Sequence, residues 1–524
     1  MRSPLEKPIL TADQAAELVR DGQTVAIGGS GAGHAIPERM LEALGRRFRA
    51  SGGPRGLQLV HPFGVGNQGS RGLEQMAHPE MYARVIGGHW SMAPTMAKLA
   101  ARNLFEAYCL PAGVIVQLFH AAAAGSPGYM TEIGLHTFVD PRLEGGKLND
   151  VTREDIVELA RRNGKEYLFY PTIPIDVALI KGSVADTQGN IGMREEVAPW
   201  HNLAMAQAAR ANGGITIAQV KRVVEAGSLD PRDVRIPGIF VDCLIVDPAH
   251  GMTYEIFYEP ALAGDTRKPE SEFPPFDFSL RKVVARRAAM ELRPGAVLNV
   301  GFGMPDGVIK VAREQGFADQ VVATIEQGQI GGIPAEGLEF GAAYNATAIV
   351  ETGQQFAFYH GRGVDVTFLG FAEVDAEGNV NVSKLGDTIV GVGGFIDISQ
   401  KARKVVFCGT LAVRGKFEIA GVGLRAVKLG APKFVERVRQ VTFSGRNAHA
   451  TGQEVLYITE AAVFRLTPDG VRLEEIAPGL EFERDIVPQL GFRPAVKEPL
   501  GVMAAELFRE EPLPAALFPH FTPC

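Results

Sequence analysis

The sequence predicts an α/β protein made of two similar domains with mainly parallel sheets, related by internal duplication. The chain has 524 residues, more than one hydrophobic core usually serves, so two or more large domains are expected. Apolar, strand-like runs at residues 24–27 and 296–300 each lead through glycine-rich residues into a helix-like stretch. A turn built from Asp, Gly and Asn follows a strand at residues 186–191 and again at residues 375–380.

The first half opens with a helix, followed by a strand, a glycine-rich loop and a second helix. Thr11, with Gln14 three residues later, predicts a capped helix start. Residues 24–27 predict the strand, residues 28–33 the loop, and residues 36–48 the helix. This unit offers backbone N–H groups to an anion. A nicotinamide-binding fingerprint is disfavoured, because no acidic residue follows on a second strand at the expected distance.

The remainder of the first half predicts loops, strands and then a linker. Loops at strand ends are predicted for the glycine-rich and proline-containing stretches 61–64, 87–90 and 111–115, and buried strands for residues 166–171 and 177–180. Four prolines among charged residues break the periodicity between residues 258 and 280. We therefore divide the chain into an N-terminal domain at 1–265, a linker at 266–280 and a C-terminal domain at 281–524.

The second half repeats this order of elements. Residues 281–291 predict a helix and residues 296–300 a strand, and residues 301–305 lead into a helix that ends near residue 315. Residues 364–369 predict the counterpart of the strand at 177–180. Because duplicated α/β domains share their topology, we expect the active site in the cleft between the two domains.

A carboxylate stands at the end of one predicted strand of the second half. Residues 321–325 predict a buried parallel strand, Glu326 follows it directly, and glycines come at positions 328, 331 and 332. In an open α/β sheet the carboxyl ends of the strands face the ligand crevice. A structural Glu lies more often on a helix surface or an exposed loop. Glu326 is therefore the leading candidate for a chemical role, and we expect it in a cleft.

Composition excludes several classes of function. The chain carries 53 basic and 60 acidic residues, a net charge of −7 without long like-charge runs, so it has no basic footprint for nucleic acid. The first residues contain no signal-peptide core, and no apolar run reaches the roughly 20 residues that a membrane helix needs. We expect a cytoplasmic protein with no nucleic-acid partner and no membrane partner.

Cysteines and histidines predict no metal site. The four cysteines are far apart and lack CxxC spacing, which fits a reducing compartment without structural zinc. Cys243 and Cys408 lie in apolar, strand-like runs and are predicted to be buried packing thiols. The histidines of the first half do not pair at ligand spacing, so we predict that no metal is bound.

Three motifs of the second half together resemble the family I CoA-transferases. They are Gly-Phe-Gly-Met-Pro at 301–305, Glu-Gln-Gly-x-x-Gly-Gly-Ile-Pro-Ala at 326–335 and Gly-Val-Gly-Gly-Phe-Ile-Asp-Ile at 391–398. Matches at residues 125–128, 137–142 and 380–384 extend the resemblance to nearly the whole chain. The sequence is similar to the single-chain acetate/propionate CoA-transferase type, in which two related α/β domains are fused.

The resemblance implies that Glu326 is a nucleophile. In such enzymes this glutamate attacks the thioester carbonyl of an acyl-CoA to give an acyl-glutamyl anhydride, and the CoA thiolate then converts the anhydride to a glutamyl-CoA thioester. A second carboxylic acid reverses the steps. The chemistry needs an ionised carboxylate and oxyanion donors. The implied partners are acyl-CoA and small carboxylic acids, with no cofactor, since CoA is a substrate that Glu326 carries covalently.

The resemblance also assigns roles to residues around Glu326. It implies that the N–H of Gly394 is an oxyanion donor. The residues implied to contact CoA are Val300, Gly301, Phe302, Gly303, Met304 and Gly393. The residues expected in the substrate pocket are Ala112, Gly31, Gly331 and Gly332. The family also implies a homodimer or a homotetramer.

One position departs from the family pattern. The family commonly has Pro-Gln-Gly where this chain has Pro-Ala-Gly at 111–113, and the amide of that glutamine is an oxyanion donor. Ala112 has no such group, so transfer is slower by about a hundredfold to a thousandfold unless Gln117, Gln327 or Gln329 takes over. Two further readings stay open. One is an acyl-CoA hydrolase that uses the same glutamate, and the other is a non-catalytic binding protein with this fold.

Overall fold

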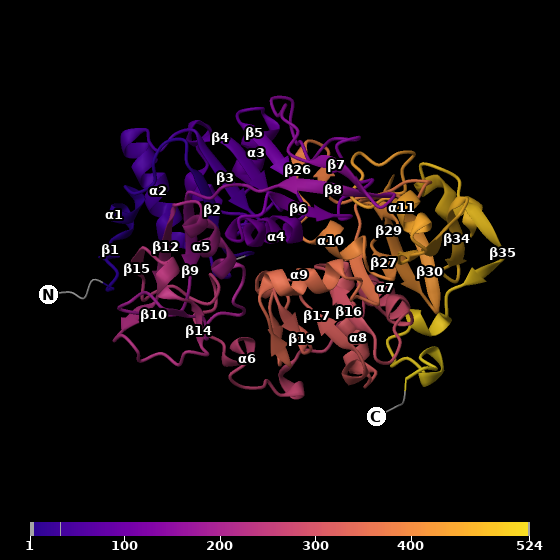
Figure 1. The fold of residues 1–524 in the computed structure, drawn as a ribbon. Coiled ribbons are helices and arrows are strands. Elements are labelled where there is room, and N and C mark those ends of the chain that lie inside the picture. Colours follow the sequence, from indigo (N-terminus) through magenta and orange to yellow (C-terminus); the bar gives the residue numbers. More distant parts are fainter. Residues whose placement is uncertain (1–4, 32, 522–524) are drawn as a thin grey trace.

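The computed structural model describes residues 5–31 and 33–521, and Figure 1 shows them as two α/β halves that lie side by side. Each half is built around one large sheet. The indigo-to-magenta half contains the N-terminal residues, and the orange-to-yellow half the C-terminal ones. Helices α4, α9 and α10 lie where the two halves meet (Figure 1). Buried apolar side chains pack within each half and across this contact, and they fill a large fraction of the interior.

The first sheet has eight strands, all parallel, in the order β1-β15-β12-β9-β2-β3-β4-β5. Fully buried strands such as β9 fit a parallel sheet with both faces covered by helices or loops. The strand bounds are β1 (Ile9–Leu10), β2 (Thr24–Ile27), β3 (Leu57–His61), β4 (Tyr82–Gly87), β5 (Glu106–Cys109), β9 (Val177–Lys181), β12 (Ile215–Val220) and β15 (Cys243–Val246).

The second sheet has ten strands in the order β21-β18-β17-β16-β22-β27-β32-β33-β34-β35. Its centre, from β17 to β32, is parallel, and antiparallel strands flank it on both sides. The strand bounds are β16 (Val297–Val300), β17 (Val322–Thr324), β18 (Gln329–Ile330), β21 (Ala348–Ile349), β22 (Val366–Gly370), β27 (Lys404–Cys408), β32 (Glu454–Ile458), β33 (Ala462–Thr467), β34 (Gly470–Ile476) and β35 (Ala495–Val502).

The two sheets share a core of five parallel strands. The order β15-β12-β9-β2-β3 in the first matches β32-β27-β22-β16-β17 in the second, and each set follows the same chain order. A backbone hydrogen bond from Gly28 to the Leu179 oxygen (3.0 Å) has its counterpart from Gly301 to the Phe368 oxygen (2.8 Å). The α/β class with mainly parallel sheets is confirmed, and this shared order is what an internal duplication produces.

Helices cover the sheets, and the four helices that the sequence predicts are confirmed as α1, α2, α7 and α8. Thr11 caps the first helix and exchanges a capping-box pair of hydrogen bonds with Gln14, as predicted. The helix bounds are α1 (Ala12–Ala16), α2 (Glu38–Ser51), α3 (Pro94–Ala101), α4 (Ala112–Ala123), α5 (Asn202–Ala211), α6 (Pro260–Ala263), α7 (Leu280–Ala289), α8 (Gly307–Glu314), α9 (Thr352–His360), α10 (Phe395–Ser399) and α11 (Gly445–Ala450).

Smaller sheets complete the fold. The strand predicted at 166–171 is confirmed, but it lies in a three-stranded antiparallel sheet and is only partly buried. The remaining strands are β6 (Gly128–Thr131), β7 (Glu158–Arg162), β8 (Lys165–Pro171), β10 (Val184–Asp186), β11 (Ile191–Gly192), β13 (Arg222–Val224), β14 (Val234–Ile236), β19 (Ile333–Pro334), β20 (Ala343–Tyr344), β23 (Glu373–Val374), β24 (Val380–Asn381), β25 (Lys384–Leu385), β26 (Thr388–Ile389), β28 (Ala412–Val413), β29 (Lys416–Ala420), β30 (Gly423–Lys428) and β31 (Ala431–Pro432).

One sequence-based prediction of a loop is wrong. Residues 111–115 are not a loop after a strand, because α4 begins at Ala112 directly after Pro111. Pro111 has φ −57° and ψ 135°, an extended conformation that ends the preceding segment just before the helix. The helix then continues through small and apolar residues and is buried along most of its length, since it packs between the two halves. Tertiary packing therefore overrides the turn signal.

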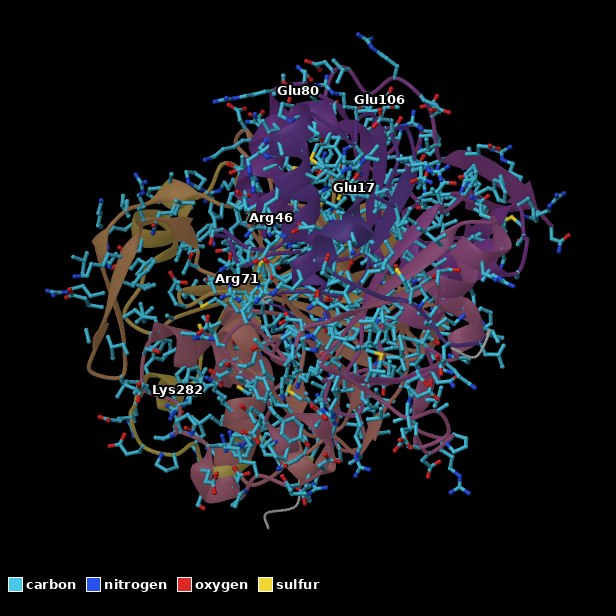
Figure 2. The ribbon with its side chains drawn as sticks, turned by 90° about the vertical axis from the view of Figure 1, so that its left-hand side faces the viewer. Glu17, Arg46, Arg71, Glu80, Glu106 and Lys282 are labelled. Carbon is cyan, nitrogen blue, oxygen red and sulfur yellow. The ribbon has the colours of Figure 1, made fainter. Side chains whose placement is uncertain are left out.

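The surface carries mixed charge. Figure 2 shows acidic Glu17, Glu80 and Glu106 on the same face of the first half as basic Arg46 and Arg71. Cysteines 243 and 408 are buried thiols, and burial raises the pKa of both, as expected for packing residues. Among the residues that the structure describes, no helix is long and apolar enough to cross a membrane.

Candidate active site

Glu326 lies in the tight turn that joins β17 to β18. The parallel strand β17 ends at Thr324, and β18 runs back antiparallel to it. The Gly328 N–H donates to the Ile325 oxygen at 3.0 Å and closes the turn. Gly328 has φ +132°, and a Cβ there would lie 2.1 Å from the Val350 oxygen, so only glycine fits. The turn holds the partly exposed Glu326 at the carboxyl end of the second sheet.

The carboxylate of Glu326 has hydrogen-bond donors on both sides. The amide Nε2 of Gln327 donates to Oε1 at 3.1 Å, and the backbone N–H of Gly394 also donates to the carboxylate. Burial, followed by the nearby Asp397 carboxylate, raises the pKa of Glu326 to about 7, while the two donors oppose this rise. Glu326 is therefore an ionisable carboxylate whose charge changes near neutral pH.

The loop that carries Gly394 is held in place by the first half of the chain. The N–H groups of Val392 and Gly393 both donate to the Gly88 oxygen at 2.8 Å, and the Ala112 N–H donates to the Gly393 oxygen at 2.8 Å. A Cβ on Gly394 would lie 1.9 Å from Glu326 Oε2, so the backbone approaches the carboxylate as only glycine allows. Contacts across the two halves thus position the donor.

A buried polar chain connects this loop to the first half. Asp397 is fully buried and accepts from the Gly113 N–H at 3.1 Å and from His360 Nε2–H at 2.8 Å. The hydroxyl of Tyr129 and His360 Nδ1 are hydrogen-bonded at 3.0 Å. Burial raises the pKa of Asp397, and the His360 hydrogen bond lowers it. Sequence reasoning did not assign roles to Asp397, His360 or Tyr129, although Asp397 belongs to the glycine-rich motif at 391–398.

The residues predicted to contact CoA follow the end of β16. Val300 is buried, whereas Phe302 is 60% exposed and its ring lies edge-on to Phe340 with centroids 5.3 Å apart. Gly303 has open space where a side chain would project, and Met304 begins the short helical turn before α8. Gly301 continues the backbone from β16, and Gly393 lies apart from this group, in the loop beside Glu326. The stretch from 300 to 304 therefore lies at the carboxyl end of the central strand β16, where Phe302 is exposed.

The residues predicted for the substrate pocket lie in three different places. Ala112 is fully buried at the start of α4, in the apolar cluster of the second half. A Cβ on Gly31 would lie 3.6 Å from the Phe340 oxygen, so the first-half loop reaches the second half here. Gly331 and Gly332 form the turn after β18 and pack against residues 344–347. Their assignment to a pocket stays a prediction.

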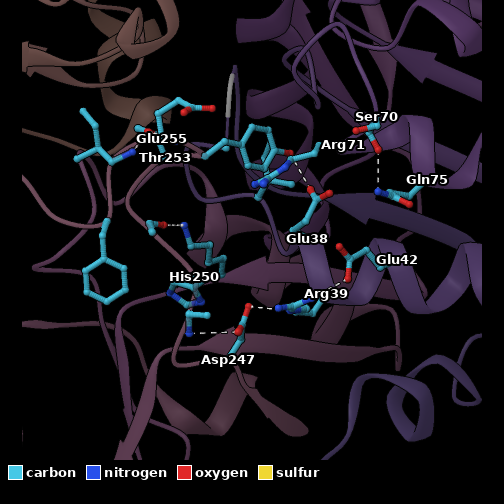
Figure 3. A pocket seen from close by; sticks show the side chains of 18 residues that line it. Glu38, Arg39, Glu42, Ser70, Arg71, Gln75, Asp247, His250, Thr253 and Glu255 are labelled. Atoms are coloured by element: carbon cyan, nitrogen blue, oxygen red, sulfur yellow. Dashed lines mark hydrogen bonds and ion pairs between the residues drawn. The ribbon is translucent and has the colours of Figure 1, made fainter.

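A separate cavity of about 500 Å³ lies entirely within the first half (Figure 3). It is at the carboxyl ends of the strands of the first sheet, where Lys181 ends β9 and Asp247 follows β15. Figure 3 shows Arg39 bonded to Asp247 and Glu42 on its wall. Its lining residues come from 33–75, 181 and 247–257, and Glu326 is not among them. The cavity is therefore distinct from the site around Glu326.

Among the described residues, no group of three His, Cys, Asp or Glu side chains is placed to hold a metal ion. The polar groups near Glu326 are instead a carboxylate, an amide and backbone N–H groups. Such a set suits covalent carboxylate chemistry with oxyanion stabilisation.

Comparisons with known proteins point to one family. A family model described as coenzyme A transferase matches residues 9–247. The chain is 42% identical over 504 residues to acetate CoA-transferase YdiF of Escherichia coli O157:H7, covering 96% of this chain and 95% of that protein. It is also 42% identical over 511 residues to caffeate CoA-transferase of Acetobacterium woodii, covering 96% and 97%.

A solved structure extends the match to three dimensions. The E. coli O157:H7 acyl-CoA transferase YdiF, crystallised as a thioester complex with CoA, superposes with a TM-score of 0.92 at 40% identity. The match covers 98% of each chain. The similarity therefore includes both halves of the fold and the segments that surround Glu326. On these grounds the chain belongs to the coenzyme A transferase family, as an enzyme of the single-chain type that the motifs indicate.

Proposed function

We propose that this enzyme transfers CoA from a short-chain acyl-CoA, of the acetate and propionate type, to a carboxylic acid through covalent intermediates on Glu326. The observation that carries the proposal is the Glu326 carboxylate at a strand end, with the Gly394 N–H directed at it. The E. coli relative described as a thioester complex with CoA supports a covalent step, and the relative named for acetate supports a small acid.

The reaction uses the ionised form of Glu326. One carboxylate oxygen attacks the thioester carbonyl carbon, the oxyanion that forms collapses, and the C–S bond breaks to give an acyl-glutamyl anhydride and CoA thiolate. The thiolate attacks Cδ of Glu326, and the acyl group leaves as a carboxylate. A second acid reverses the sequence. Because the pKa of Glu326 is about 7, the fraction of ionised nucleophile rises with pH through the neutral range.

The stretch from Val300 to Met304, at the carboxyl end of β16, is the proposed path of CoA. Its exposed Phe302 ring and the space beside Gly303 leave room for a pantetheine arm next to the strand end. Gly393 lies in the donor loop, where the arm meets Glu326. CoA is a substrate in this scheme, and the chemistry requires no metal and no resident cofactor.

Trapping tests the proposal. The protein is incubated with acetyl-CoA without an acceptor acid, treated with hydroxylamine or borohydride, digested and analysed by mass spectrometry. We expect modification of the peptide that contains Glu326, and none in a folded Glu326→Ala variant. An unmodified Glu326 in active protein would contradict the covalent route. Release of one equivalent of acetate per site, with CoA retained on the enzyme, indicates transfer, whereas continuous release of acetate and free CoA without an acceptor indicates a hydrolase.

Two assignments accompany this proposal. We propose that the enzyme acts in the cytoplasm and that it forms a homodimer or a homotetramer. Light scattering coupled to size-exclusion chromatography measures the oligomeric state directly, and a monomeric mass at micromolar concentration would contradict the proposed dimer or tetramer.

A further inference from the structure

Ala112 stands where the family pattern has a glutamine whose amide is an oxyanion donor. Three other glutamines, Gln117, Gln327 and Gln329, are candidates to supply such a donor. Two of them are already engaged elsewhere. Gln117 Nε2 donates to the Gly353 oxygen at 2.8 Å, and Gln329 Nε2 donates to the Val197 oxygen at 2.9 Å. The amide of Gln327 is the one that donates to Glu326, at 3.1 Å from Oε1.

The position of the Gln327 side chain is fixed by its surroundings. It is 2% exposed, and its backbone oxygen accepts from Thr352 Oγ1 at 3.1 Å. A Cβ on Gly341 would lie 3.3 Å from Gln327 Cδ, so the backbone of that glycine closes one side of the amide. The burial limits the alternative rotamers of Gln327, and a donor that is already oriented costs little reorganisation during the reaction.

The two donors contact different sides of the carboxylate. Gln327 is bonded to Oε1, whereas the Gly394 backbone lies next to Oε2. When one oxygen of Glu326 forms the anhydride, the other remains as the carbonyl oxygen of the glutamyl group. With Oε2 as the nucleophile, Oε1 is that carbonyl oxygen and stays against the Gln327 amide.

We propose that Gln327 is a catalytic residue whose Nε2–H stabilises the oxyanion formed on Glu326 itself. This inference rests on the proposed function. In the step concerned, the CoA sulfur forms a bond to Cδ and the C=O electron pair moves to Oε1. The pair then returns, the C–O bond to the acyl group breaks, and the acid leaves as a carboxylate. Charges and atoms balance without another reactant.

The hydrogen bond contributes to the rate because it strengthens during this step. In the anhydride Oε1 is a neutral carbonyl oxygen, and in the tetrahedral intermediate it carries a full negative charge. Hydrogen bonds to charged acceptors are roughly twice as strong as neutral ones. Only an interaction that is stronger in the transition state than before it accelerates the reaction.

Single-turnover kinetics tests the role of Gln327. Acetyl-CoA is mixed with excess enzyme at pH 9, where Glu326 is ionised, and the glutamyl-CoA thioester is quantified by quenched-flow mass spectrometry. We expect Gln327→Ala to form the thioester about a hundredfold more slowly. Gln327→Met, which keeps a similar side-chain length but has no N–H donor, should be slowed at least as much. Gln117→Ala is the matched control and should stay within about threefold of the parent enzyme.

The outcomes separate this inference from the proposed function. A parent enzyme that forms thioester at Glu326, with both Gln327 variants within threefold of it, would overturn the role of Gln327 and leave the proposed function intact. A parent enzyme that never modifies Glu326 would overturn both. If one Gln327 variant fails to fold, as judged by thermal unfolding, the rate of the other decides the question.

Discussion

The two sheets present different crevices at matching places. The first crevice lies at the carboxyl ends of β2 and β9, and the second at those of β16 and β22. By strand register, Val60 in β3 corresponds to Thr324 in β17, so Pro62 occupies the place of Glu326. The first crevice therefore has no carboxylate at the position where the second has its candidate nucleophile.

The crevices also differ in the residue that ends a matching strand. Lys181 at the end of β9 corresponds to Gly370 at the end of β22. Lys181 is 1% exposed, and its ammonium bonds to the Gly251 oxygen and pairs with Glu196 at 3.3 Å. Gly370 has no atom within 4 Å of where its side chain would begin. Duplication thus supplied one framework, in which the matching strand end carries a buried, ion-paired lysine in one copy and a glycine with free space beside it in the other.

The largest effect is expected from a change at Gly394, whose N–H donates to the Glu326 carboxylate in the second crevice. Gly394→Ala places a methyl group 1.9 Å from the present Glu326 Oε2 and displaces the N–H or the carboxylate. We expect kcat for acetyl-CoA-dependent transfer to fall about 10²- to 10³-fold. Gly361→Ala, whose new methyl group has no contact closer than 3.4 Å, is the control. If Gly394→Ala and Gly361→Ala had equal kcat values, Gly394 would have no role in the mechanism.

Filling the second crevice tests whether its open space admits CoA. Gly370→Leu adds a branched side chain where the first crevice has Lys181. We expect KM for acetyl-CoA to rise about tenfold, a loss of about 1.4 kcal/mol of binding, with a smaller change in kcat. Gly370→Ala should lie between this variant and the parent. An unchanged KM for the leucine variant would place the CoA path elsewhere.

The pH profile reports on the charge that surrounds Glu326. With a Glu326 pKa of about 7, kcat/KM should rise through neutral pH and level off above it. Asp397 raises that pKa, so Asp397→Asn should move the rising limb to lower pH. Asn also weakens the contacts to Gly113 and His360, so the free energy of unfolding should drop by about 1–3 kcal/mol. If the rising limb of the pH profile stays at the same pH while the free energy of unfolding falls, Asp397 has only a structural role.

The smallest effect is expected in the first crevice. Arg71 lies on its wall and stacks over the Tyr254 ring at 4.8 Å (Figure 3). Arg71→Ala should cost about 0.5–1 kcal/mol of stability and leave kcat/KM within about twofold of the parent value. A tenfold loss of kcat/KM for acetyl-CoA would show that the first cavity takes part in the reaction.

Local pattern made much of the fold predictable. The strand at 24–27, the capped helix after Thr11 and the Asp-Gly-Asn turns all appear where the sequence indicates them. Each depends on neighbours in the chain, because caps and tight turns are closed by hydrogen bonds over a few residues. The start of α4 at Ala112 was missed, because its burial between the two halves outweighs the local signal for a turn.

The sequence by itself determined the class of fold, the duplicated order of strands and the prominence of Glu326, since periodicity and glycine spacing are local properties. Only the tertiary structure decided what surrounds that carboxylate. Gly88 and Ala112 hold the loop of Gly394 from more than 270 residues away in the chain, and Asp397 meets Gly113 across the same contact. Such contacts depend on how two domains pack, and no pattern of neighbouring residues encodes that arrangement.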